Sequence, residues 1–487
     1  MFASTVLNYM DRQAIALVSP QIQAEFAINN ETFGWVLAAF TLTYALLQVP
    51  AGLMADRLDV RRLYLGAVVW WSLAGIASAF APTLAVLIAC RALLGVGESF
   101  NWPCALKVTG RVLPAADRGL GNGIFNSGAA VGAVITPLIV PFVTVRYGWR
   151  TAFVAVGLLG FVWSAAWLLA VRGPVAGILA GEPAPKPLLP SGTSGRLQPR
   201  AWLAFSLLLV DAVAVGLIGY RQAGAVGCWL GVATLMTGLL IVARLLPLNT
   251  LGATGWGRSL GEVVRLRRFW IMVVVAISIN ICWHFLVSWL PKYLNSERKM
   301  TGLVSLFESF LAADTPKRTE TAIFLVSSVV TALIFLAADA GNLLGGLGSR
   351  LLAGRGLKPS SARLRIMGLC VLAISAGAWV GRVSNDYACM ALLALMALGA
   401  AAFMANYFAF CQEVDPSATG LVVGILGGMG NLFAAGILPF AGWVKDSTGS
   451  FAPIFVLVGL SPLVGLLILS LAWGNDPHPP VSPTQTN

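Results

Sequence analysis

Long apolar runs, broken by short segments rich in Gly, Pro and Arg, dominate this chain. A helix needs about 20 predominantly apolar residues to cross a bilayer, and the roughly ten-residue alternating segments of a membrane barrel do not occur in the sequence. The pattern predicts an all-α polytopic membrane protein. We expect about fourteen spans, at 8–26, 34–55, 63–82, 84–106, 120–145, 150–172, 202–220, 224–246, 270–293, 322–347, 364–382, 387–410, 418–443 and 452–473.

Composition and charge agree with a membrane protein. Hydrophobic residues make up 58% of the 487 and charged residues only 11%, whereas a soluble domain carries roughly 25%. The net charge of +12 comes largely from arginines in loops that lie inside the cell if the N-terminus is cytoplasmic, so it indicates positive-inside topology and not a nucleic-acid partner. We expect a multi-pass protein of the inner (plasma) membrane. The seven cysteines are isolated and show no metal-binding spacing.

The spans divide into two halves separated by an insertion. We expect an N-terminal six-helix bundle, a cytoplasmic linker, an inserted transmembrane hairpin, a second linker, a C-terminal six-helix bundle and a polar tail, at 1–172, 173–200, 201–247, 248–269, 270–474 and 475–487. The hairpin is expected to pack outside the twelve-helix core, with Asp211 buried against its hairpin partner. Residues 295–321 form an inserted outer loop, in which the apolar residues from Leu303 to Leu311 predict an interfacial helix.

Four ionisable side chains lie inside apolar spans: Asp11 and Arg12 in the first, Arg91 and Glu98 in the fourth. Each costs roughly 2.5 to 3.5 kcal/mol at the bilayer centre, so the four must face one another, water or a ligand. Arg91 and Glu98 are seven residues apart, which places them within about 20° of the same helix face.

The residue types predict the chemistry of this site. Arginine offers a permanently charged planar fork suited to a carboxylate, so Arg12 and Arg91 are candidates to bind an anion. A buried acid beside an arginine changes its protonation with occupancy, so Asp11 and Glu98 are candidates to carry a coupled proton. The alternative is that Asp11 with Arg12, and Arg91 with Glu98, are ion pairs that only hold helices together.

A loop motif places the chain in a family. The segment from Gly52 to Arg62, with Asp56, Arg57 and Arg61 at fixed spacing, resembles the G-x-x-x-D-R-x-G-R-R signature of the major facilitator superfamily, with Asp59 in place of the inner glycine. In this motif we expect Gly52 to allow close helix approach, Asp56 to bridge a neighbouring helix end and the arginines to anchor the turn. A degenerate second copy starts at Gly345. The resemblance implies two six-helix bundles, here with the hairpin added.

Within the superfamily the chain resembles the anion:cation symporter branch, and most closely its bacterial hexuronate and galactonate type. The residues that carry this resemblance are Asn8-Tyr9-Met10-Asp11-Arg12, Tyr44, Arg91 to Glu98, Asn126, Trp289-Leu290-Pro291-Lys292-Tyr293-Leu294 and Asn406. It implies proton coupling through Asp11 and Glu98 and substrate binding by Arg12 and Arg91. The implied function is secondary active import of a sugar acid or similar organic anion by proton symport with alternating access. We expect the proton to be the coupling ion, no other cofactor to be needed and a monomer to be the functional unit.

Other polar residues are weaker candidates. Tyr44 and Asn126 are expected to bond substrate hydroxyls or to make ordinary interhelical contacts. His284 is the one histidine in a predicted span, with a role in coupling, in substrate binding or in packing alone. Asn406 is a further substrate candidate, and Asp339 lies in a span that resembles the cavity-lining helix of the branch.

Competing classes of protein are disfavoured. The sequence has no G-x-x-x-x-G-K-[ST] nucleotide loop for a primary pump, and its two histidines offer no metal triad for an enzyme. The remaining alternatives are a transporter-like sensor that binds an organic anion without flux, a uniporter of the same fold, and coupling to sodium in place of the proton. No basic tail precedes the first span, so we expect its helix to begin almost at Met1 and the natural start to lie upstream.

Overall fold

A computed structural model describes residues 1–113, 118–172, 263–311, 317–414 and 419–473, together with Val175, Gly177 and Leu179. Every regular element in these ranges is a helix, and ten of the helical segments are long and apolar enough to cross a membrane. The prediction of an all-α multi-pass protein is confirmed. The predicted hairpin at 202–246, with Asp211 and Cys228, lies outside the described residues, so the count of fourteen spans stays a prediction.

The first half of the chain forms eight helical segments. They are α1 (Phe2–Leu17), α2 (Ser19–Phe26), α3 (Asn30–Arg57), α4 (Val60–Ala79), α5 (Leu84–Glu98), α6 (Asn101–Val112), α7 (Arg118–Tyr147) and α8 (Trp149–Ala170). The helix begins at Phe2, directly after Met1, as predicted. Within this half α1 packs on α7, α4 on α8, and α5 between α3 and α4.

Two predicted spans are each divided in two. Residues 8–26 were expected as one helix, but α1 ends at Leu17 and α2 begins at Ser19, with Pro20 in its first turn. Likewise α5 ends at Glu98 and α6 starts at Asn101, two residues before Pro103. Proline lacks the N–H that would continue the helical hydrogen bonds, which explains why a break stands just before each proline.

The second half contains the remaining helices. They are α12 (Arg267–Lys292), the π-helical turn η1 (Tyr293–Arg298), α13 (Thr301–Phe310), α14 (Arg318–Gly354), α15 (Pro359–Ser375), the 3-10 turn η2 (Ala376–Arg382), α16 (Asp386–Val414), α17 (Thr419–Thr448) and α18 (Ala452–Ala472). Here α14 packs on α16, α12 on α17 and α18, and α15 on α16. The helix predicted in the loop after Leu294 is present as α13, where Val304 is buried but Phe310 is 80% exposed.

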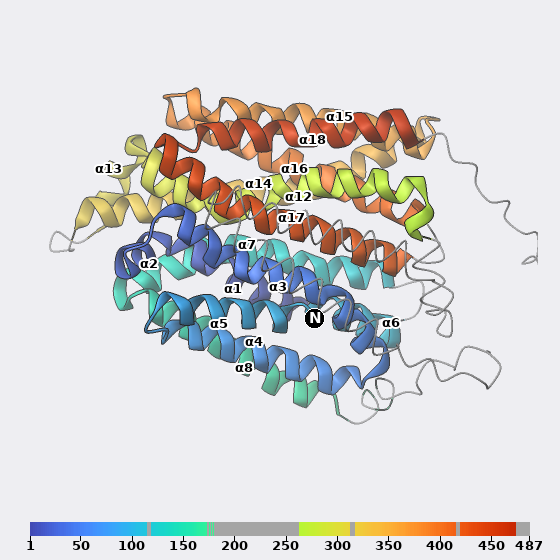
Figure 1. Ribbon diagram of the computed structural model, residues 1–487, viewed down its shortest axis with the longest axis horizontal. Coiled ribbons are helices and arrows are strands. Elements are labelled where there is room, and N and C mark those ends of the chain that lie inside the picture. Colours follow the sequence, from blue (N-terminus) through green and yellow to red (C-terminus); the bar gives the residue numbers. More distant parts are fainter. Residues whose placement is uncertain are drawn as a thin grey trace, which may run out of the picture.

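The two halves lie side by side (Figure 1), with α1 to α8 below and α12 to α18 above in that view. They meet mainly where α3 packs along α17 and α7 along α14, with a smaller contact between α1 and α12. Both α2 and α13 lie at one end of the bundle, which we call the α13 end. Our topology prediction places this end outside the cell.

The loop motif lies where α3 gives way to α4. Asp59 caps α4 by accepting a hydrogen bond from the Arg61 N–H at 3.0 Å, and it pairs with the Arg61 guanidinium at 2.8 Å. This contact with Arg61 holds the pKa of Asp59 below its ordinary value. Arg62 lies 3.9 Å from Asp59 and its side chain is 90% exposed. The side chains of Asp56 and Arg57 lie outside the described part of the structure.

The packing around the first glycine of the motif differs between its two copies. A Cβ atom added at Gly52 would meet no atom within 4 Å, so among the described residues no helix packs closely on it. In the second copy the corresponding glycine does allow close approach, because a Cβ at Gly345 would lie 2.7 Å from the backbone of Ala402 in α16. Close packing of α14 on α16 therefore requires glycine at Gly345, whereas no described neighbour requires it at Gly52.

Candidate functional site

A buried ion pair joins the first and fourth predicted spans. Arg12 of α1 donates from Nε to Glu98 Oε2 at 2.8 Å. The Glu98 side chain is fully buried, whereas 16% of the Arg12 side chain remains accessible. The alternative pairing of Asp11 with Arg12 and of Arg91 with Glu98 is therefore wrong in its partners. Neighbouring residues on a helix point about 100° apart, so Arg12 faces α5 while Asp11 faces elsewhere.

Arg91 lies on the same face of α5 as Glu98, about two turns before it, as their spacing predicts, and it also turns toward α1. It is 2% exposed, and its Nη1 lies 3.5 Å from the backbone carbonyl oxygen of Asp11. The Asp11 carboxylate is buried as well and faces α4, since a Cβ added at Gly75 would lie 3.3 Å from its Oδ1. All four charged residues thus meet where α1, α4 and α5 come together.

Glycines allow α5 to lie this deep in the half. A Cβ at Gly95 would lie 2.4 Å from the Phe40 carbonyl oxygen of α3, and one at Gly97 would lie 2.9 Å from Trp71 of α4. Thr43 adds a hydrogen bond from its Oγ1 to the Ala92 carbonyl oxygen at 2.9 Å. The backbone of α5 therefore touches both neighbours, which leaves its face with Arg91 and Glu98 turned toward α1.

Aromatic rings hold the two guanidinium groups in place. The Arg12 guanidinium carbon lies 4.3 Å from the ring centroid of Tyr44, 5.2 Å from that of Phe40 and 5.5 Å from that of Tyr9. Arg91 shares the Phe40 ring, at 5.1 Å. Such cation–π contacts stabilise a desolvated cation without consuming its N–H groups. Tyr44 therefore lies at the predicted site, as a face for Arg12.

Three polar atoms of this cluster have no hydrogen-bond partner among the described residues: Arg12 Nη2, Arg91 Nε and Glu98 Oε1. Buried polar atoms in folded proteins are nearly always paired, and an unpaired charged group is the most costly case. Tyr44 also interacts with Arg12 and Asn8 with Glu98. The cluster therefore combines paired charges with buried donor and acceptor atoms that a polar ligand could engage.

His284 approaches from the second half. It lies in α12, close enough to Arg12 for their charges to interact, and its Nδ1 is 3.0 Å from the Asn280 carbonyl oxygen. A carbonyl oxygen only accepts, so Nδ1 carries the hydrogen and Nε2 of a neutral ring is left as an acceptor. Asn431 of α17 also interacts with the His284 ring, so the predicted candidate lies near Arg12 and is held by groups of the second half.

The other predicted residues are placed less closely. Asn406 of α16 is buried and donates from Nδ2 to the carbonyl oxygens of Gly345 at 3.1 Å and Ala402 at 3.0 Å, which links α16 to α14 within the second half. Asn126 falls in α7, and its side chain lies outside the described part. Asp339 of α14 is partly buried and lies within electrostatic range of Tyr9.

The residue that sequence reasoning missed is Phe40. It stacks on both arginines, yet phenylalanine in a membrane span carries no polar signal. The available signal was its position one helical turn before Tyr44, which puts both rings on one face of α3, where they stack at 5.8 Å.

Comparison with known proteins agrees with this architecture. Residues 1–432 match the Major Facilitator Superfamily. The chain is 28% identical over 485 residues to a D-galactonate transporter of Escherichia coli O6:H1, covering 98% of this chain and 94% of the relative. It is also 32% identical over 170 residues to a hexuronate transporter of Escherichia coli K12, covering 35% of this chain and 39% of that relative.

Solved structures share the fold. A bacterial homologue of the human lysosomal transporter Spinster, in an inward-facing and occupied conformation, matches with a TM-score of 0.59 at 16% identity, covering 96% of this chain and 92% of that one. A POT family transporter in complex with a thioalcohol-conjugated peptide matches with a TM-score of 0.65 at 15% identity, covering 96% and 93%. The chain is a transporter and not an enzyme, and it belongs to the Major Facilitator Superfamily.

Proposed function

We propose that this protein imports a sugar acid or a similar organic anion by proton symport. The observation that carries the proposal is the buried pair of Arg12 and Glu98 beside Arg91, with an unpaired donor on each arginine and an unpaired acceptor on the glutamate. Relatives that transport D-galactonate and hexuronate, as their names state, support the substrate class.

The donors fit a carboxylate. Arg12 Nη2 and Arg91 Nε belong to planar groups held on the faces of Phe40 and Tyr44, so their directions are set before a ligand arrives. A carboxylate that accepts from both would gain charge-assisted hydrogen bonds in a site largely shielded from water. The hydroxyl groups of a sugar acid would find an acceptor in Glu98 Oε1, and His284, within electrostatic range of Arg12, is proposed as a further partner of the substrate.

Coupling follows from competition for Arg12. The Glu98 carboxylate accepts a hydrogen bond from Arg12 Nε, and an arginine beside an acid favours the ionised form of that acid. A substrate carboxylate bound to the same guanidinium would weaken the attraction between Arg12 and Glu98. Because the Glu98 side chain is fully buried, its charged form would then be less favourable. Glu98 would then take up a proton from the outer side together with the anion, and release it inside when the anion leaves. Asp11, buried beside Arg91, is proposed as a second carrier of the proton.

The proposal also covers the membrane location, the functional unit and the loop motif. We place the protein in the inner (plasma) membrane with its N-terminus in the cytoplasm, because this orientation puts the arginine-rich loops inside. The charge cluster is built from helices of one chain, so we propose a monomer as the functional unit. The gating role of Gly52, Asp56, Arg57, Arg61 and Arg62 in alternating access remains a proposal of the same kind.

Purified protein in proteoliposomes tests the function. A thermal-shift screen against D-galactonate, D-glucuronate, D-galacturonate and acetate identifies binders, because a ligand that binds only the folded state stabilises it. Uptake of the labelled binder is then measured with an acidic exterior and with no pH gradient. Symport predicts accumulation only with the gradient. Binding without counterflow would indicate a sensor, and counterflow without gradient-driven accumulation a uniporter.

A further inference from the structure

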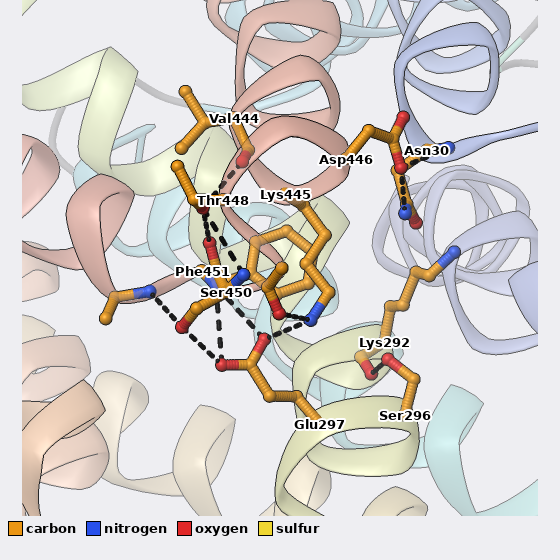
Figure 2. Close-up of polar contacts among 12 residues, drawn as sticks. Asn30, Lys292, Ser296, Glu297, Val444, Lys445, Asp446, Thr448, Ser450 and Phe451 are labelled. Carbon is orange, nitrogen blue, oxygen red and sulfur yellow. Dashed lines mark hydrogen bonds and ion pairs between the residues drawn. The ribbon is translucent and has the colours of Figure 1, made fainter.

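A carboxylate from the second half caps a helix of the first half at the α13 end. Asp446, near the end of α17, accepts hydrogen bonds from Asn30 Nδ2 at 2.5 Å, from the Asn30 backbone N–H at 3.3 Å and from the Glu31 backbone N–H at 2.8 Å. Figure 2 shows Asp446 turned to Asn30, at the start of α3. The first turn of a helix has unpaired N–H groups and a partial positive charge, which a carboxylate stabilises.

The helix backbones touch at the same place. A Cβ added at Gly442 of α17 would lie 2.2 Å from the Asn30 carbonyl oxygen, and one at Gly34 of α3 would lie 2.4 Å from Cα of Pro439. No side chain fits between α3 and α17 here, so the two halves are closed against each other at the α13 end in this structure.

A buried cation lies next to this contact without an ion pair. Lys292, the last residue of α12, is 6% exposed, and no carboxylate of the described residues lies within ion-pair distance of its Nζ. Its Nζ lies 5.7 Å from the ring centroid of Phe33 and 6.0 Å from that of Trp289, and the charge of Lys445 is also within range. In Figure 2 its side chain extends toward Asn30 and Asp446, and the charges of Lys292 and Asp446 interact.

The neighbouring lysine is already engaged. Lys445 donates to Glu297 Oε2 at 2.7 Å and to the Gly449 carbonyl oxygen at 2.6 Å. Glu297 also accepts from Ser450 Oγ at 2.7 Å and from the Phe451 N–H at 3.0 Å (Figure 2). This network ties the end of α17 to η1, directly after α12. Asp446 and Lys292 therefore belong to one connected body, and α3 is the element that can move away from them.

We propose that Asp446 is a positioning residue of the transport cycle with two alternative partners. With the α13 end closed, its carboxylate caps α3 across the two halves. When that end opens, α3 withdraws and Asp446 turns to Lys292, which pairs with it inside the second half. In the closed state Lys292 lacks the carboxylate, and in the open state the first turn of α3 lacks it. Asp446 and Lys292 therefore shift the balance between closed and open. This inference is independent of the substrate and of the coupling ion.

Removal of Asp446 and removal of the Lys292 charge should change the separation of the two halves at the α13 end in opposite directions, and this difference tests the proposal. Spin labels are attached at Tyr147→Cys, at the end of α7, and at Tyr387→Cys, at the start of α16, both exposed and in different halves. Their distance distribution is measured by pulsed EPR in detergent without substrate, for the full chain and for Asp446→Ala and Lys292→Met. The parent without the two tyrosine changes shows whether the native cysteines are labelled. Methionine keeps an apolar contact with Phe33 and Trp289 while it removes the charge.

Asp446→Ala should shift the distribution to longer distances, because the closed state loses the cap on α3. Lys292→Met should shift it to shorter distances, because the open state loses the partner of Asp446 and the closed state no longer buries an unpaired cation. Asp446→Asn should shift it less than Asp446→Ala, since an amide oxygen still caps a helix. Shifts of both variants in the same direction, or no shift in variants that elute as folded protein, would overturn the proposal.

Discussion

At the scale of single residues, the site depends on which arginine meets which acid. Arg12 takes Glu98 as its partner, and Arg91 is left with a carbonyl oxygen and a ring face. Arg91 is therefore the group with more hydrogen-bonding capacity left for a ligand, and it is held more deeply than Arg12.

Arg91→Lys tests this assignment. Lysine keeps the charge but loses the planar fork, so we expect the affinity for the transported anion to fall about 5- to 150-fold, the equivalent of roughly 1 to 3 kcal/mol for a charge-assisted hydrogen bond left unmade. Binding is measured by calorimetry on purified protein. Arg350→Lys, an exposed arginine of α14, is the matched control and should bind like the parent. Unchanged affinity in Arg91→Lys would remove Arg91 from the site.

Arg12→Lys is expected to differ from Arg91→Lys. Arg12 also holds Glu98, so its replacement disturbs both anion binding and the ion pair. We expect a weaker affinity together with a shifted pH dependence of uptake, because the acid loses part of the contact that favours its ionised form. The measurement is the initial uptake rate across external pH. A loss of affinity with an unaltered pH profile would separate Arg12 from coupling.

The sequence predicted much at this scale, but not the partners. The cost of burying charge identified Asp11, Arg12, Arg91 and Glu98, and the seven-residue spacing placed Arg91 and Glu98 on one face. Which acid Arg12 meets depends on the register between α1 and α5, and no pattern within either segment encodes that register. The contacts of the Phe40 and Tyr44 rings with the arginines likewise depend on how α3 packs against α1 and α5, which no single segment encodes.

At the scale of helices, α5 depends on small residues. Gly95 lies against the backbone of α3 and Gly97 against Trp71 of α4, so any side chain at either position would separate helices that the charge cluster requires close together. The broken helices were not predicted because the apolar pattern continues through Pro20 and Pro103. Periodicity reports which face is apolar, but it does not separate these two prolines from Pro50 or Pro439, through which α3 and α17 continue.

Gly95→Ala should destabilise the protein. The added Cβ would lie 2.2 Å from Thr43 Oγ1 and 2.4 Å from the Phe40 carbonyl oxygen, and backbone does not yield easily. Overpacking of this kind costs about 1 to 3 kcal/mol. The midpoint of thermal unfolding in detergent should therefore fall. Gly66→Ala in α4 is the control, since its Cβ would meet nothing within 4 Å, and it should leave the midpoint equal or higher. Equal midpoints for both variants would contradict the close packing of α5.

At the scale of the whole molecule, two helical bundles meet along α3 with α17 and α7 with α14. The repeat of the loop motif predicted two halves, and the structure places α1 to α8 and α12 to α18 accordingly (Figure 1). The contacts between halves were beyond the sequence, because Asp446 and Asn30 lie more than 400 positions apart. The role of residues 201–247 stays a prediction, since they lie outside the described residues.

Removal of the predicted hairpin tests the twelve-helix core. The charge cluster is built from α1, α4 and α5 with rings from α3. We therefore expect that deletion of residues 202–246, with the flanking segments joined, leaves transport in place. Gradient-driven uptake by the shortened protein is compared with that of the full chain at equal amounts of folded protein. If uptake is lost while the folded fraction is unchanged, the hairpin is part of the transport machinery.

The most direct measurement of the central claim is transport by Glu98→Gln in proteoliposomes. Glutamine mimics the protonated acid permanently, so the variant should exchange labelled substrate across the membrane but fail to accumulate it when the exterior is acidic, whereas the parent does both. Accumulation by Glu98→Gln equal to that of the parent would contradict the account. Loss of both activities in a folded variant would also contradict it, because the pair of Arg12 and Glu98 would then be structural.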